Sequence, residues 1–110
     1  MPEPKTMLEA TAEANNLTAV ALIKDMYVEK MENLCGGNQP YINPTILENH
    51  HEEIMQDCMH NFDKIPKMGG DEFSTAYREK LEDELKQSFE HFSLQNRGKN
   101  VFGYVLFVLS

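Results

Sequence analysis

The stretch PKTMLEATAEANNLTAVA, residues 4–21, decides how the chain begins to fold. Thr6 and Glu9 have the Ser/Thr-x-x-Glu spacing of a capping box, in which two side chains satisfy backbone N–H groups that a helix start leaves unpaired. Pro4 precedes them, and proline is favoured at a helix start because it lacks an N–H group. A long helix is therefore expected to begin here.

Apolar residues recur at spacings of three and four as far as Cys35, where Gly36 and Gly37 form the first interhelical turn. A helix over residues 7–35 would be roughly 43 Å long, which favours an elongated bundle. The residues expected on its inward face are Leu8, Ala12, Ala19, Leu22, Ile23, Met26, Tyr27, Met31 and Leu34.

A second helix is expected from Pro44 to about Lys64, because Asn43 suits the N-cap and proline suits the first helical position. Pro66 ends it, since proline disfavours helical backbone in the residue before it. The expected inward residues of this helix are Leu47, Ile54, Cys58, Phe62 and Ile65.

Gly69 and Gly70 form the second interhelical turn and lead to Asp71, which is expected to cap a third helix over residues 72–96. Gly98 is expected to end that helix. Its large apolar residues are mostly four apart, so they spread over a broad arc that can pack against two neighbours. They are Phe73, Tyr77, Leu81, Leu85, Phe89 and Phe92.

The predicted fold is all-α, an elongated antiparallel three-helix bundle with a short apolar C-terminal tail. Residues 1–6 are expected to be a linker, residues 7–100 the bundle, and residues 101–110 the tail. The tail's run VFGYVLFVL has nine residues, whereas a helix needs about 20 to span a bilayer. It could be only the start of a truncated membrane segment.

Composition narrows the function. The net charge of −8 argues against nucleic acid as a partner, because nucleic-acid binders concentrate Lys and Arg. The N-terminus lacks the apolar region of a signal peptide, and the two cysteines, Cys35 and Cys58, do not resemble a disulfide scaffold. The chain is expected to be cytoplasmic, with both thiols reduced.

No catalytic, cofactor-binding or metal-binding residue is predicted. Both diglycine turns lack the lysine of a phosphate-binding loop, so GTP should not bind. His51-Glu52 is followed by Met55 where a zinc protease needs a second histidine. An alternative from another class is a metal-binding bundle that uses Glu48, His50 and His51.

The chain up to about Phe102 resembles the helical middle domain of the atlastins, which belong to the guanylate-binding and dynamin-related GTPases. The residues that carry the resemblance are Pro4-Lys5-Thr6-Met7-Leu8, Ala10-Thr11-Ala12-Glu13-Ala14-Asn15, Leu17, Ala19-Val20-Ala21, Cys35-Gly36-Gly37, Lys67-Met68-Gly69-Gly70, Glu72-Phe73 and Lys99-Asn100-Val101-Phe102.

The resemblance implies a stalk or lever in proteins that tether and fuse endoplasmic reticulum membranes. Pro2 and Pro4 would set the pivot between the GTPase domain and this bundle. GTP and Mg²⁺ belong to the full-length family. By the resemblance this chain would begin after the GTPase domain, so it is not expected to be an enzyme. The implied partners are the middle or GTPase domain of an atlastin-like protein, and the implied location is the cytosolic face of the reticulum.

A second alternative is a peripheral membrane binder whose tail, residues 101–109, inserts into the lipid interface. The acidic body of the chain would be repelled by anionic lipid, which weighs against this alternative.

Overall fold

The computed structural model describes the backbone of residues 7–109 and the side chains of residues 10–100. Its helices are α1 (Met7–Cys35), α2 (Pro44–Lys64) and α3 (Asp71–Leu109). There is no strand among the described residues. The predicted all-α, three-helix class is confirmed, and α1 and α2 have the predicted bounds.

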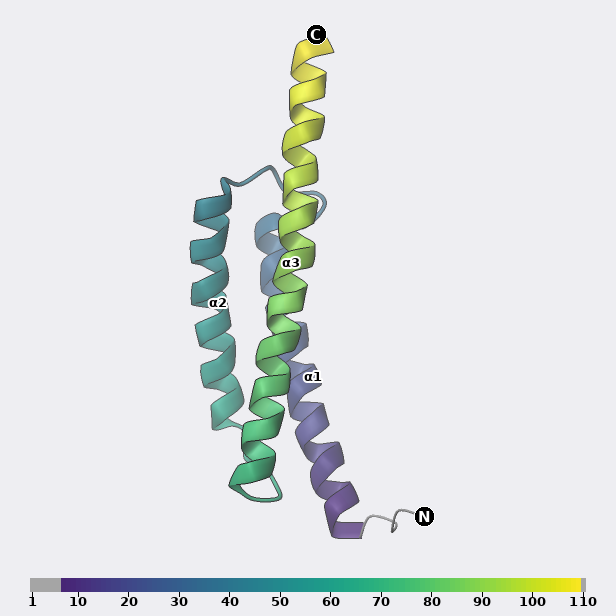
Figure 1. Ribbon diagram of the computed structural model, residues 1–110, viewed down its shortest axis with the longest axis vertical. Helices are drawn as coiled ribbons and strands as arrows, with labels where there is room; N and C mark the ends of the chain where they lie inside the picture. Colours follow the sequence, from purple (N-terminus) through teal and green to yellow (C-terminus); the bar gives the residue numbers. More distant parts are fainter. Residues whose placement is uncertain (1–6, 110) are drawn as a thin grey trace.

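The helices form an elongated up-down-up bundle in which α1 and α3 run in the same direction and α2 runs back between their ends (Figure 1). The principal extents are 65 × 32 × 18 Å, and every pair of helices is in contact. The start of α1 and the end of α3 lie at opposite ends of the long axis (Figure 1). Anything attached to these two ends would therefore be held apart by the length of the bundle.

One hydrophobic core runs between the three helices. Two small residues of α1, Ala12 and Ala19, are buried, and larger side chains fill the remaining space. The fully buried large residues come from all three helices and are Tyr27, Met31, Leu47, Phe62, Leu81 and Leu85. Burial of each such side chain contributes about 1.5–3 kcal/mol, so the core is the main source of stability.

Two residues predicted to face inward are exposed. Leu22 is 60% exposed, because it lies about 100° around α1 from the buried Ile23 and falls outside the buried arc. Phe73 is 44% exposed, because it lies in the first turn of α3, at the end of the bundle, where its ring faces the Cβ position that Gly69 leaves empty. Apolar spacing alone did not separate these residues from the core.

The predicted end of the third helix is wrong. α3 passes through Asn96 and Gly98 and ends only at Leu109, so residues 101–109 continue the helix. A glycine ends a helix when it takes a left-handed conformation, whereas among the described residues only Gly69 and Gly70 have positive φ. Within a helix, glycine costs only about 1 kcal/mol relative to alanine.

Within the described part of the chain, no helix is long and apolar enough to cross a membrane. The side chains of the predicted tail, residues 101–110, lie outside the described residues.

Candidate interaction surfaces

The predicted pivot and first cap fall largely outside the described residues. Pro2, Pro4 and Thr6 are not described, and Glu9 is described only as a backbone position in α1. Their roles stay predictions.

The other two predicted caps differ in the structure. Asn43 is the N-cap of α2, and its Oδ1 accepts a hydrogen bond of 2.9 Å from the backbone N–H of Thr45. Asp71 does not cap α3 but is its first residue, because the carbonyl of Gly70 already accepts the bond from the Ser74 N–H. Asp71 instead places a negative charge at the positive end of the helix dipole.

The first turn, at Gly36 and Gly37, is held by side chains of α3. The Asn96 carboxamide makes two bonds to Ile42: Oδ1 accepts from its N–H at 3.0 Å, and Nδ2 donates to its carbonyl at 2.8 Å. Lys99 Nζ donates to the Cys35 carbonyl at 2.9 Å and also to that of Gly36. A lysine at this place satisfies carbonyls that the end of α1 leaves unpaired.

The second turn, at Gly69 and Gly70, is held by a side chain of α1 in the same way. Asn16 Nδ2 donates to the Met68 carbonyl at 2.9 Å, and its Oδ1 accepts from the Met68 N–H at 3.1 Å. Asn15 adds a weaker bond of 3.4 Å to the Pro66 carbonyl. Each turn is therefore fixed by the helix that does not enter it.

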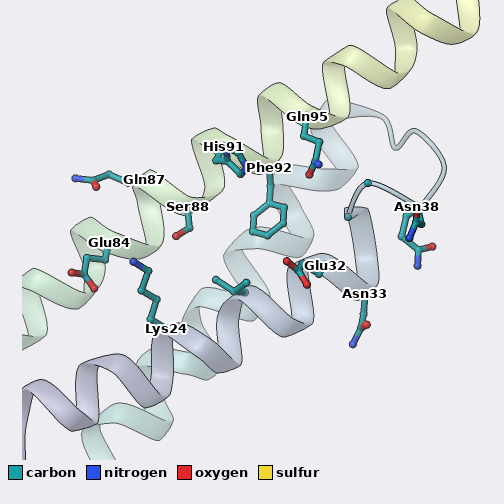
Figure 2. Close-up of a pocket in the computed structure, with 14 residues that line it drawn as sticks. Lys24, Glu32, Asn33, Asn38, Glu84, Gln87, Ser88, His91, Phe92 and Gln95 are labelled. Atoms are coloured by element: carbon teal, nitrogen blue, oxygen red, sulfur yellow. The ribbon is translucent and has the colours of Figure 1, made fainter.

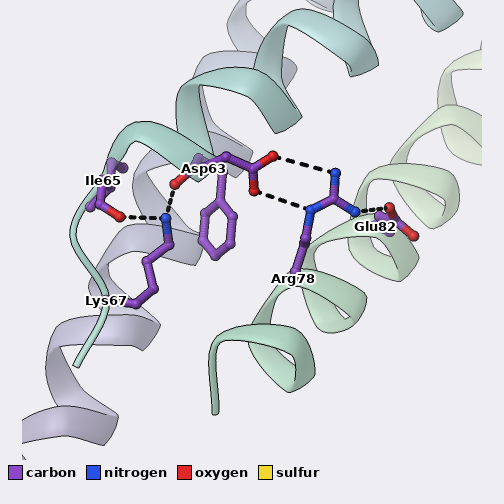
Figure 3. Close-up of polar contacts among 6 residues, drawn as sticks. Asp63, Ile65, Lys67, Arg78 and Glu82 are labelled. Atoms are coloured by element: carbon purple, nitrogen blue, oxygen red, sulfur yellow. Dashed lines mark hydrogen bonds and ion pairs between the residues drawn. The ribbon is translucent and has the colours of Figure 1, made fainter. Parts of the chain in front are cut away.

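Figure 3 shows the charged groups around the end of α2. Lys67 Nζ donates to the carbonyls of Phe62 and Ile65, and burial lowers the pKa of this lysine. Arg78 on α3 bonds Asp63 on α2 at 3.1 Å and Glu82 on its own helix at 2.7 Å. Lys67 thus satisfies carbonyl groups at the C-terminal end of α2, and Arg78 forms an ion pair that connects α2 and α3 at the surface.

Of the two histidines considered for metal binding, His51 is part of the core. His51 is buried, its Nδ1 lies 2.7 Å from the Tyr27 hydroxyl, and its ring stacks on Phe89 with centroids 3.9 Å apart. His50 and Glu48 are exposed. Among the described residues, no group of three or more His, Cys, Asp or Glu side chains could hold a metal ion. The geometry gives the metal-binding alternative no support.

The two cysteines are free and buried. Burial raises the pKa of both the Cys35 and the Cys58 thiol, so both favour the neutral, unreactive form. Their surroundings are those of small apolar core residues.

A groove of about 710 Å³ lies between α1 and α3, next to the first turn (Figure 2). The buried ring of Phe92 points between the two helices. Polar side chains line the groove: Lys24, Glu32, Asn33, Asn38, Gln39, Glu84, Gln87, Ser88, His91 and Gln95. Such a lining suits a partner that brings hydrogen-bonding groups more than an apolar ligand.

Sequence reasoning missed Asn16 and Asn96, which are both about 1% exposed or less. Each does follow a buried apolar residue at a spacing of four, Ala12 and Phe92 respectively. A single Asn in an apolar stripe was the available signal, because a buried carboxamide must find hydrogen-bonding partners.

Comparison with curated proteins agrees with the resemblance seen in the sequence. Over 102 residues, or 93% of this chain, identity is 52% to Atlastin-3 of Mus musculus, 48% to Atlastin-2 of Xenopus laevis and 44% to Atlastin of Drosophila melanogaster. The chain is homologous to a segment of the atlastins. No family model matches it.

The matched segment makes up 19%, 18% and 19% of these three atlastins, so the chain spans about a fifth of their length. The match thus establishes an atlastin-like, three-helix piece. The activity of a whole atlastin is a separate question for this chain.

Proposed function

We propose that this chain is a stalk and lever that corresponds to the helical middle domain of the atlastin GTPases. The observation that carries the proposal is the homology over 93% of the chain, joined to the shape of the bundle. A long, narrow bundle with its two ends far apart is suited to transmit a movement from one end to the other (Figure 1).

In this proposal the chain performs no chemistry. GTP binding and hydrolysis, with Mg²⁺, would belong to another part of an atlastin, and residues 1–6 with Pro2 and Pro4 would form the pivot toward it. Residues 101–110 would lead toward the membrane at the other end. The place of action would be the cytosolic face of the endoplasmic reticulum.

We further propose a homotypic partner, the middle or GTPase domain of an atlastin-like protein. The α1–α3 groove is the surface that best suits such a contact. Its volume is about 710 Å³, and its walls present carboxamide, hydroxyl and charged groups to an approaching chain (Figure 2).

A chimera tests the lever. The matching segment of mouse Atlastin-3 is replaced by this chain, and GTP hydrolysis and lipid mixing between vesicles are measured together. The proposal expects both activities, whereas an unrelated three-helix bundle of equal length should leave hydrolysis and abolish mixing. Hydrolysis without lipid mixing in the chimera would show that the chain is not an equivalent lever.

Cross-linking tests the partner. At tens of micromolar, the chain should cross-link to the corresponding segment of Atlastin-3, and Ser88→Arg in the groove should weaken this. Gln56→Arg, on the exposed face of α2, is the matched control and should have no effect. Absence of any cross-link would count against the homotypic contact, and equal loss in both variants would count against the groove.

A further inference from the structure

Tension between the two ends of this bundle would load α1 and α3 in a particular way. The helices run in the same direction, α1 starts at one end of the long axis, and α3 finishes at the other (Figure 1). Pulling the start of α1 away from the end of α3 therefore slides one helix along the other. The load is a shear along their shared length.

The contacts that resist such sliding stand at both ends of the overlap. At one end, Asn96 and Lys99 of α3 bond Ile42 and the carbonyls that end α1. Moving α3 toward its C-terminus would stretch these bonds, because Lys99 would withdraw from the Cys35 carbonyl at which α1 ends.

At the other end, Asn16 of α1 holds Met68 just before α3 begins. Moving α1 toward its N-terminus would draw Asn16 away from Met68, which is tied to α3 through two glycines and so follows that helix. Both carboxamides are buried. When either pair of hydrogen bonds breaks, the polar groups are therefore left without a partner until water reaches them, which raises the free energy.

We propose that α1 and α3 form a shear-loaded tension element, locked at one end by Asn16 on Met68 and at the other by Asn96 and Lys99 on the first turn. The element lets the bundle carry tensile force between its ends without unfolding. The inference rests on the proposed function, because the bundle is under tension only if it connects two other parts of a protein. Its resistance to force can nevertheless be measured on the chain alone.

The direction of load is the distinguishing feature. Force applied between residues 10 and 100 acts on both locks and on the core between them at the same time. Residues 38 and 100 lie near each other at the first turn, because Lys99 bonds the carbonyls of Cys35 and Gly36. Force applied between them opens the lock at Asn96 and Lys99 first and reaches Asn16 last. Unfolding under force is governed by the height of the barrier to unfolding, which is higher when contacts must break together.

Single-molecule pulling with click-reactive residues at these positions tests the proposal. The unaltered sequence should unfold at clearly higher force with handles at 10 and 100 than with handles at 38 and 100. Equal rupture forces in the two geometries would overturn the proposal, and this comparison requires no destabilised variant.

Asn16→Ala gives the second arm. At a fixed force between residues 10 and 100, this variant should unfold about tenfold faster. The reason is that the loss of two hydrogen bonds made by a buried side chain lowers the barrier to unfolding. Its first rupture between 38 and 100 should be unchanged, and Asn33→Ala, an exposed carboxamide on the same helix, should match the unaltered chain in both geometries. Equal acceleration of Asn16→Ala in both geometries would mean a general loss of stability and no lock. These results are independent of the lipid-mixing test, so either proposal can fail alone.

Discussion

The hydroxyl of Tyr27 on α1 lies 2.7 Å from Nδ1 of His51 on α2, and both side chains are buried. The imidazole ring also stacks on Phe89 of α3, so all three helices meet at this one ring. Burial lowers the pKa of His51, and the nearby Glu52 and Glu48 oppose that shift only in part. The folded bundle therefore resists protonation of this histidine.

Stability should fall as the pH drops below about 6.5, the ordinary pKa of histidine in an unfolded chain. Since the folded pKa is lower, the unfolded state takes up the proton first, and the free energy of unfolding falls until the folded pKa is reached. Thermal unfolding followed by circular dichroism should show a lower Tm at pH 5 than at pH 7.5. His51→Gln should flatten this dependence, whereas the exposed neighbour variant His50→Gln should keep it. An unchanged slope in His51→Gln would assign the effect to other groups.

Asn96→Ala should destabilise the bundle by about 3 kcal/mol, because two hydrogen bonds are lost and the Ile42 N–H and carbonyl are left without this partner. Urea denaturation measures the change, and the slope of the transition should stay the same. Gln95→Ala, at the exposed neighbouring position, should cost less than about 0.5 kcal/mol. Similar losses in the two variants would remove the special role given to Asn96.

Much of the fold was predictable from the sequence because its signals are local. Apolar spacing, the Asn43-Pro44 start and the glycines after Cys35 each act within a few residues, and they placed α1 and α2 correctly. The length of α3 was not predictable from Gly98, because a glycine ends a helix only when the backbone there turns left-handed, and Gly98 does not.

The locks at the turns escaped sequence reasoning for a different reason. Asn16 and Met68 are 52 residues apart, and Asn96 and Ile42 are 54 apart, so no short motif joins either pair. The sequence showed only that a polar residue stood in an apolar stripe. Its hydrogen-bonding partner could be identified only in the folded bundle, where each turn packs beside the helix that it does not connect.

Leu81→Ala should destabilise the bundle by about 2–5 kcal/mol, because Leu81 is fully buried between the helices and its truncation leaves a cavity. Leu22→Ala is the matched control, since this leucine is 60% exposed although its spacing placed it inward. It should change the free energy of unfolding by less than about 0.5 kcal/mol. The free energy of unfolding of both variants is measured by chemical denaturation. A large decrease for Leu22→Ala would show that Leu22 belongs to the core.

Metal should have no effect on the folded chain. His51 is held by Tyr27 and Phe89, and the described residues include no group of side chains that could hold an ion. The Tm should be the same in a chelator, in buffer alone and with added Zn²⁺, and metal analysis of the purified protein should find less than one ion per chain. A drop in Tm on chelation would revive the metal-binding alternative.

Gly36→Ala should be destabilising, because a Cβ at this position would lie 2.5 Å from the Glu32 carbonyl oxygen, which already accepts the Gly36 N–H bond. The turn would have to shift, which would disturb the hydrogen bond that Lys99 donates to the Gly36 carbonyl. Gly98→Ala should have the opposite effect on stability, because this glycine lies inside α3 with open space around its Cβ position. Alanine there should stabilise the helix by about 0.5–1 kcal/mol. Thermal unfolding should therefore move Tm in opposite directions, and a lower Tm for Gly98→Ala would show that α3 does not run unbroken through this position.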